Sequence, residues 1–140
     1  METSEARRHL AASDVARLAT AGADGSPHIV PIVFALDGDH LYFAVDAKPK
    51  RSRALKRLQN IAANPAVSVI VDHYEDDWTK LWWVRADGVA RVVTDEAEAR
   101  HATERLVSRY PQYRNAPPGG PVVAVRIERI TGWSGAVTSR

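Results

Sequence analysis

The chain has 140 residues, of which 45% are hydrophobic and 26% are charged, and its formal net charge is +2. This length suits one domain, residues 1–140, and the composition is that of an ordinary globular protein. There is no cysteine, which excludes a disulfide framework and thiolate chemistry. No apolar run approaches the roughly 20 residues that cross a bilayer, and the N-terminus lacks an apolar signal core. We therefore expect a cytoplasmic protein.

The first half of the chain is predicted to form a short helix and three strands. Helical spacing of apolar residues predicts the helix over Ser4 to Ala12. Tight turns are expected at Asp24-Gly25 and Asp37-Gly38-Asp39, because glycine accepts the positive φ that such turns need. The strands are predicted over Val15 to Ala21, His28 to Leu36 and Leu41 to Val45.

The second half is predicted to alternate helices with strands. Leu55, Leu58 and Ala62 form one apolar stripe, which predicts a helix over Lys50 to Ala63 that Asn64-Pro65 ends. The remaining elements are a buried strand over Ala66 to Asp72, a hairpin of Leu81 to Arg85 and Val89 to Thr94 joined by Asp87-Gly88, a helix from Thr94 to about Tyr110, a loop over Pro111 to Pro121 and a last strand over Val122 to Ile130.

These elements predict a mainly β fold with α-helices. Six or seven strands with hairpin turns and two or three helices give an antiparallel barrel or sandwich decorated by helices. The closely spaced strands and Asp-Gly turns argue against a parallel doubly wound sheet. No GxGxxG motif follows a strand, so the sequence does not indicate a Rossmann dinucleotide site.

The most charged segment lies where the third predicted strand meets the following helix. Six of the ten residues from Lys48 to Arg57 are basic. A helix N-terminus favours anions, and two or three charge-assisted hydrogen bonds of roughly 1.5–3 kcal/mol each would orient a phosphate. The segment offers a hydroxyl at Ser52 and cations at Lys50, Arg51, Arg53 and Arg57. A solvated basic helix face is the alternative.

Aromatic residues form a second candidate site. Trp78, Trp82 and Trp83 fall within six residues, and Trp133 lies near the C-terminus. Neighbouring residues on a strand point to opposite faces, so one of Trp82 and Trp83 can fill the core while the other meets solvent, a ligand or a second subunit. Indole stacks on flat heteroaromatic rings. Core packing together with a subunit contact is the alternative.

The other reactive side chains give little pattern. The five histidines lack HxH or HExxH spacing, so no metal site is predicted. His28 could donate a hydrogen bond to a ligand from the start of its strand, and a surface or core role is the alternative. There is no GxSxG elbow and no Ser/His/Asp set, and no catalytic residue is predicted.

Several stretches follow one another in a distinctive order. The run ATAGADGSPHIVPIVFALDGDHLYFAVD is followed by the basic junction, then by NPAVSVIVDHY and an apolar hairpin. This order resembles the pyridoxamine 5′-phosphate oxidase-like superfamily. The stretch DHYEDDWTKLWWVRADGVARVV and the ending RITGWSG are similar to a small subgroup of actinobacterial coenzyme F420-dependent oxidoreductases. The resemblance covers Val15 to Gly135. It implies an antiparallel split β-barrel (FMN-binding split barrel) with flanking helices, forming a homodimer with a cofactor groove at the subunit interface.

The resemblance also implies which residues bind the cofactor phosphate. Lys50, Arg51 and Ser52 match the family's phosphate-binding junction. Arg57 and Asn60 match the basic residue and the asparagine that precede the family's Asn-Pro turn. This sequence has a few extra residues ahead of Asn60, which leaves the register of the basic segment open.

Residues beside the cofactor ring are implied in the same way. His28 and Pro31 lie on the strand that runs along the ring in the family. Trp82 or Trp83, together with Trp133, is implied to come from the partner subunit or the groove wall.

The chemistry implied is hydride transfer between the deazaflavin coenzyme F420 and an unidentified small, electron-poor substrate. The polyglutamate tail of F420 would account for surplus charge at Lys48, Arg53 and Lys56. The alternatives are an FMN-dependent oxidase or reductase, and a non-enzymatic carrier of F420 or haem. A nucleic-acid patch is disfavoured by the low net charge and the absence of a helix-turn-helix.

Overall fold

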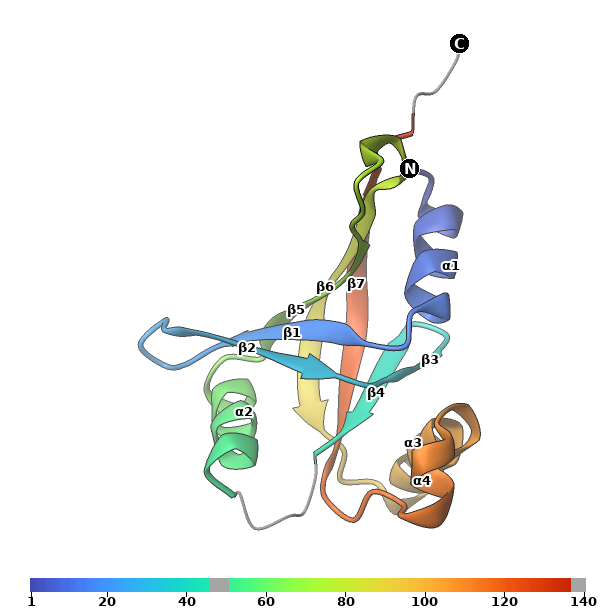
Figure 1. Ribbon diagram of the computed structural model, residues 1–140. Coiled ribbons are helices and arrows are strands. Elements are labelled where there is room, and N and C mark those ends of the chain that lie inside the picture. The colour runs from blue at the N-terminus through green and yellow to red at the C-terminus, as the bar shows by residue number, and fades with distance from the viewer. Residues whose placement is uncertain (46–50, 137–140) are drawn as a thin grey trace.

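The computed structural model describes residues 1–45 and 51–136, with the side chains of the second range described from Lys56 onward. Figure 1 shows helices placed around one curled sheet. In chain order the elements are α1 (Thr3–Ala12), β1 (Ala16–Ala21), β2 (Pro27–Ile32), β3 (Ala35–Asp37), β4 (His40–Ala44), α2 (Arg51–Ala63), β5 (Ala66–His73), the 3-10 turn η1 (Trp78–Lys80), β6 (Trp82–Val92), α3 (Glu96–Arg109), α4 (Pro111–Asn115) and β7 (Val122–Ser134).

Within the described residues, seven strands form one sheet in the order β2-β1-β5-β6-β7-β4-β3, with every neighbouring pair antiparallel. The long strands β6 and β7 run the height of the molecule, and β1 and β2 cross them (Figure 1). The mainly β, antiparallel fold with flanking helices that the sequence predicts is therefore confirmed. In the same part of the chain, no helix has both the length and the apolar character to span a bilayer.

The core lies on the inner face of this sheet. The strand β5 buries alternate residues, Val67, Val69 and Val71, because successive side chains point to opposite faces. Val69 stands in register between Leu18 on β1 and Ala86 on β6, so three strands contribute to one layer. Burying an aliphatic side chain of this size contributes about 1.5–3 kcal/mol. This layer fixes the register of β1 against β5, on which the candidate site depends.

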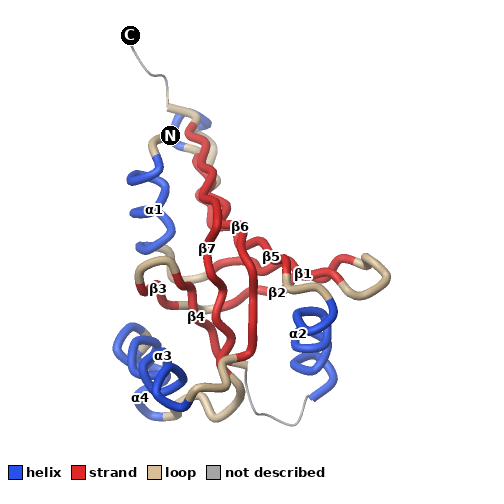
Figure 2. Tube along the Cα trace, turned by 180° about the vertical axis from the view of Figure 1, so that it is seen from behind, coloured by secondary structure: helices blue, strands red, loops and turns tan. Residues whose placement is uncertain are grey.

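The helices cover different parts of the sheet, as Figures 1 and 2 show. The helix α1 packs against the distal halves of β6 and β7, whereas α2 packs against β1 and β6. The helices α3 and α4 lie together at the β3–β4 side. The helices α2 and α3 are therefore on separate sides of the molecule.

The strand β6 differs from the predicted hairpin. Its eleven residues run without a turn through Asp87-Gly88, and the irregularity there is a shift of register against β7. Glycine is needed at position 88 for close approach, since a Cβ built there would clash with the carbonyl oxygen of Arg126. The predicted turns at Gly25 and Gly38 are confirmed, with φ of 83° and 57°.

Three other boundaries differ from the predictions. The run predicted as one strand, His28 to Leu36, forms β2 and β3, which lie at opposite edges of the sheet. The predicted loop after α3 contains α4, which starts with Pro111, a residue suited to the first turn of a helix. The strand β7 continues four residues past Ile130 and ends at Ser134.

Two arginines of α3 donate hydrogen bonds to the short edge strand β3 and to the residue just before it. Arg105 donates from Nη2 to the carbonyl oxygen of Leu36 at 2.8 Å, and Arg109 donates from Nη1 to that of Phe34 at 2.6 Å. The buried hydroxyl of Tyr110 accepts from the backbone N–H of Phe34 at 3.1 Å. These bonds attach α3 to the sheet through backbone groups that an edge strand would otherwise leave unpaired.

The N-terminal half of α3 is attached by a charged side chain. Glu98 accepts two hydrogen bonds from the guanidinium of Arg91, at 2.9 and 2.7 Å, and one from the Tyr42 hydroxyl at 2.9 Å. The bonds from Arg91, and to a smaller extent the Tyr42 hydroxyl, lower the pKa of Glu98 to about 2. Burial and the neighbouring carboxylate raise the pKa of Tyr42 to about 12.

Candidate functional site

The basic junction leads into the first turn of a long helix. Because α2 starts at Arg51, both Arg51 and Ser52 belong to its first turn. The first four backbone N–H groups of a helix have no partner within it, and no acidic residue occupies this turn of α2. Such a terminus favours an anion. Lys48 and Lys50 lie outside the described residues, as do the side chains of Arg51, Ser52 and Arg53.

The second half of α2 places a buried amide against β1. Asn60 is 2% exposed and donates from Nδ2 to the hydroxyl oxygen of Thr20 at 3.1 Å. Arg57 is half-buried and precedes Asn60 by three residues, which puts both on the same side of the helix. The side of α2 that carries Arg57 and Asn60 therefore faces the sheet.

His28 joins this group from the neighbouring strand. Its direct cross-strand partner is Thr20, and such pairs lie on the same face of a sheet. The Nδ1 atom of His28 is buried and has no hydrogen-bond partner among the described residues. We call Thr20, His28, Arg57 and Asn60 the inner polar cluster. A buried ring nitrogen without a partner costs free energy, so it suits a site where a ligand or water supplies the missing bond.

The turn between β1 and β2 closes one side of this cluster. A Cβ built on Gly22 would lie 3.3 Å from Oδ1 of Asn60, so a glycine lets the turn approach the amide. Asp24 in this turn accepts hydrogen bonds from the N–H and the hydroxyl of Ser26, which lower the pKa of its carboxyl group. Lys56 on α2 contributes a smaller lowering of the same pKa. The turn is therefore anionic where it meets the basic helix.

Pro31 lies away from the inner polar cluster. It is three residues after His28 on β2, so it faces the opposite side of the sheet, where it is exposed and in register with Arg17. The strand β5, which pairs with the other side of β1, contributes Ile70, the register partner of Arg17, to the same face. We call this side the outer face. In a single chain His28 and Pro31 cannot contact the same side of one ligand.

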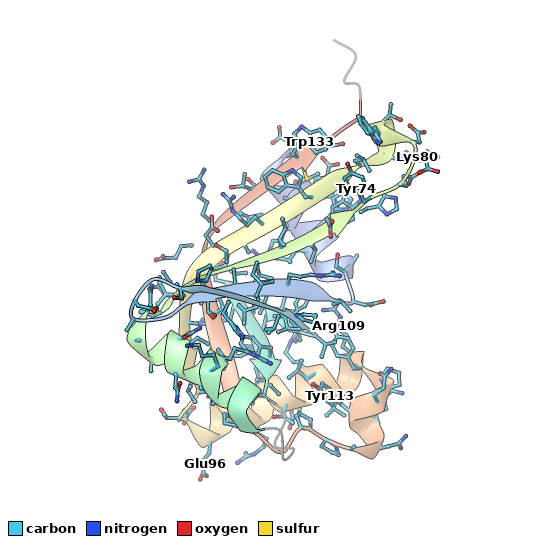
Figure 3. All side chains as sticks on the ribbon, turned by 60° about the vertical axis from the view of Figure 1, so that its left-hand side comes forward. Tyr74, Lys80, Glu96, Arg109, Tyr113 and Trp133 are labelled. Atoms are coloured by element: carbon cyan, nitrogen blue, oxygen red, sulfur yellow. The ribbon has the colours of Figure 1, made fainter. Side chains whose placement is uncertain are left out.

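The tryptophans lie at the far end of the sheet from α2. Trp82 faces inward and stacks on His9 of α1, with ring centres 4.0 Å apart, so in this chain it holds a helix in place. Trp133 is 46% exposed and stands directly opposite Trp83 on the outer face. Figure 3 shows Trp133 at the end of the molecule remote from α2.

The structure thus brings together His28, Arg57 and Asn60 of the predicted residues, and it separates Pro31, Trp82 and Trp133 from them. Thr20 was missed, although it accepts the hydrogen bond from Asn60 and stands directly opposite His28 in the sheet. A hydroxyl at a position where the alternation of the strand expects an apolar residue is the signal that could have found it. Among residues 1–45 and 51–136, no three His, Cys, Asp or Glu side chains gather as metal ligands.

Comparison with known families gives a match over almost the whole chain. The family model described as pyridoxamine 5′-phosphate oxidase matches residues 3–134. No curated protein sequence shows significant similarity to the chain.

Solved structures of similar fold span the chain as well. An FAD-binding protein from Mesorhizobium loti is 27% identical, with 94% of each chain covered and a TM-score of 0.72. The FAD-binding protein from Mycobacterium smegmatis is 25% identical, covering 95% of this chain and 96% of its own, with a TM-score of 0.68. HutZ, a haem storage protein from Vibrio cholerae, is 16% identical over 94% and 93% of the two chains, with a TM-score of 0.71, and shares the fold alone.

Proposed function

Because the chain belongs to the pyridoxamine 5′-phosphate oxidase family, and so has its split-barrel fold, we propose that it is an oxidoreductase with a flavin-type cofactor, and that this cofactor is coenzyme F420. The relatives from Mesorhizobium loti and Mycobacterium smegmatis bind FAD, which supports a cofactor of this class. The observation that carries most weight is the start of α2 at Arg51, which sets the basic junction at a helix N-terminus.

The residues present fit the phosphate of such a cofactor. Lys50 and Arg51 supply positive charge, Ser52 supplies a hydroxyl donor, and the backbone N–H groups of the first turn of α2 supply further donors. Hydrogen bonds to a charged group contribute roughly 1.5–3 kcal/mol each, so two or three would anchor one end of the molecule. Arg57 adds a third cation, three residues before the buried amide of Asn60.

The inner polar cluster fits a polar edge of the same molecule. The buried Nδ1 of His28 can donate to or accept from a ligand atom, depending on its tautomer. Asn60 is held by Thr20, so its side chain is oriented in advance of binding. In this proposal His28 and Asn60 position the cofactor, which supplies the hydride chemistry when bound.

Surplus positive charge favours F420 over FMN. Lys48, Arg53 and Lys56 exceed what one phosphate requires, and F420 carries a polyglutamate tail that they would neutralise. The electron acceptor would be a small, electron-poor molecule. The FMN-dependent oxidase or reductase remains the second candidate, because the relatives from Mesorhizobium loti and Mycobacterium smegmatis are FAD-binding proteins.

We further propose that the protein works as a homodimer that pairs its outer faces. Ile29 and Ile70 are 66% and 37% exposed there, and a soluble protein gains free energy by covering such side chains. In a dimer of this kind, Pro31, Trp83 and Trp133 would reach the cofactor bound by the partner, because all three lie on the outer face, whereas Trp82 packs inward on His9.

The test is a fluorescence titration of the purified protein with F420 and FMN side by side, followed by turnover of reduced F420 with a panel of quinones, nitroaromatics and unsaturated lactones. Tight F420 binding, weaker FMN binding and oxidation of reduced F420 by one acceptor would support the proposal. Tight FMN binding without F420 binding would replace it with the flavin enzyme. Cofactor or haem binding without any turnover would replace it with a carrier.

A further inference from the structure

A cleft between α1, β3 and α3 lies on the side of the molecule that carries α3, away from α2 (Figures 1 and 2). It measures about 490 Å³, which falls within the 300–1,000 Å³ of pockets that take small organic ligands. We call it the α3 cleft. Its apolar lining comes from Ala11 near the end of α1 and from Ala35 and Leu36 on β3, whereas its polar lining comes from α3.

Two arginines of α3 line the cleft with part of their donor capacity unused. Arg105 and Arg109 are four residues apart, so they lie on the same side of the helix. Arg105 donates from Nε and Nη2 to the carbonyl oxygen of Leu36 at 3.2 and 2.8 Å. Arg109 donates from Nη1 to the carbonyl oxygen of Phe34 at 2.6 Å and from Nη2 to that of Ser13. A guanidinium has five N–H donors, so about three on each arginine remain for a ligand.

These bonds orient the guanidinium of Arg109 without cancelling its charge, because a carbonyl oxygen is neutral. Arg109 forms no ion pair within the described part of the chain. Its guanidinium carbon lies 4.8 Å from the centre of the Phe34 ring and 5.2 Å from that of the Tyr110 ring, which further restricts its position. The cleft therefore holds a fixed positive charge that an anion can pair with.

The carboxylates near the cleft limit the charge of such an anion. Glu104 is exposed and also lines the cleft. One carboxylate oxygen of Asp37 lies 4.0 Å from Nη2 of Arg105, and the other is bonded to Nε2 of His101 at 2.6 Å. These carboxylates offset part of the positive charge, so a monoanion fits better than a dianion.

The remaining lining residues suit a ligand with a small apolar body. Ser108 lies between the two arginines in sequence and adds a hydroxyl donor to the polar wall. Ala35 on the facing strand is 4% exposed and is fixed in the sheet by its pairing with Tyr42. Arginine and hydroxyl donors on one wall, with short apolar side chains opposite, match a carboxylate group attached to a hydrocarbon body.

We propose that the α3 cleft binds a small organic monocarboxylate. The carboxylate lies between Arg105 and Arg109 and accepts a hydrogen bond from Ser108, and the apolar body packs against Ala11 and Ala35. A ligand bound there connects α1, β3 and α3, so it stabilises the folded chain. This site is separate from the inner polar cluster, and it does not depend on the identity of the cofactor.

Backbone ¹H–¹⁵N NMR of the full chain locates the site during titration with cyclohexanecarboxylate. We expect saturable shifts of the Leu36 and Ser108 amide signals that exceed those of His28 and Asn60. Cyclohexanecarboxamide lacks the charge and acetate lacks the apolar body, so each should bind at least tenfold more weakly. The dianion cis-cyclohexane-1,2-dicarboxylate should bind no more tightly than the monoanion. Absence of the saturable shifts, equal binding of the amide or of acetate, or tighter binding of the dianion would overturn the proposal.

Variants of α3 separate the cleft from general attraction to a basic surface. Glu104→Gln should bind cyclohexanecarboxylate at least threefold more tightly, because a repelling charge is removed, and a loss of folded protein cannot produce such a gain. Arg105→Gln keeps a donor for the carbonyl oxygen of Leu36 but loses the charge, so affinity should fall at least tenfold. Arg100→Gln is the matched control: it removes the same charge from the same helix, but Arg100 lines a different cleft, so affinity should stay within twofold.

Two results with these variants would contradict the site: unchanged affinity in Glu104→Gln, or equal losses in Arg105→Gln and Arg100→Gln. Competition with the cofactor gives a further test. Saturating F420 or FMN should leave the affinity for cyclohexanecarboxylate within twofold. If either cofactor displaces the carboxylate, the cleft is part of the cofactor site and the proposal of a separate site is wrong.

Discussion

The side-chain amide of Asn60 donates a hydrogen bond of 3.1 Å to the hydroxyl of Thr20, and both residues are at least 95% buried. This bond connects α2 to β1, the strand next to one edge of the sheet. It therefore fixes the position of α2 relative to β1 and His28.

Breaking this pair should destabilise the protein and loosen the site together. Thr20→Val leaves the buried Nδ2 of Asn60 without an acceptor, which should lower the free energy of unfolding by about 1–3 kcal/mol. Asn60→Leu should cost a similar amount. The double variant should lose less than the sum of the two, because neither partner is then left unpaired. Urea unfolding of the four proteins measures this coupling, and strictly additive losses would contradict it.

The basic junction is tested by removing its charges. Replacing Lys50 and Arg51 with alanine should weaken cofactor binding at least tenfold in a fluorescence titration, because the phosphate loses two cations. The melting temperature should change little. Lys80→Ala with Arg100→Ala removes the same charge at positions remote from α2 and should leave affinity within twofold. If both double variants bind equally well, the basic segment is a solvated helix face.

Acid should weaken the attachment of α3 through Glu98. The pKa of this carboxyl group falls from its ordinary value of 4.5 to about 2 on folding, chiefly through Arg91 and then Tyr42. The stabilisation is therefore present above pH 4.5 and is lost as the pH falls toward 2. We expect Glu98→Gln to lower the free energy of unfolding by about 1 kcal/mol at pH 7, since exposed pairs are screened.

Melting curves between pH 2 and pH 7 check this expectation. The difference in melting temperature between Glu98→Gln and the unsubstituted protein should shrink as the pH falls from 4.5 toward 2. Glu104→Gln, an exposed change on the same helix, should show no such window. A constant difference at every pH would show that the charge of Glu98 is not the cause.

Asparagine substitutions can distinguish the register shift at Asp87-Gly88 in β6 from a hairpin turn. At Gly25, where φ is 83° and nothing lies within 4 Å of a Cβ, asparagine should be tolerated because it adopts positive φ readily. At Gly88 a Cβ would clash with the Arg126 backbone and lie 2.9 Å from Cγ1 of Val125. Gly88→Asn should therefore cost at least about 1–3 kcal/mol by urea unfolding. Equal tolerance at both positions would contradict the continuous strand.

Local signals were enough to predict much of the fold. The turns at Gly25 and Gly38, the apolar stripe of α2 and the buried strand β5 each depend on residues close together in sequence. The Asp-Gly pair at 87–88 was misleading, because the sequence does not distinguish a turn glycine from one needed for approach to β7. The run from His28 to Leu36 is apolar throughout, so its division into two edge strands depends on pairing partners far away in the chain.

The site was predicted less completely than the fold. Resemblance to a family identified His28, Arg57 and Asn60, which the structure brings together around Thr20. Faces of the sheet were harder to assign. The pattern could not tell which of two neighbouring tryptophans faces inward, and that depends on the packing of Trp82 against α1.

The open sheet has two free borders, β2 and β3, and each is protected against pairing with another chain. On β2, Pro27 and Pro31 have no N–H to offer an incoming strand. On β3, which has only three residues, Arg105 already binds the carbonyl oxygen of Leu36, and Arg109 binds that of Phe34 just before it. The same arginines that attach α3 thus act against aggregation. Replacing them would expose a border on which fibril-like stacking of molecules could begin.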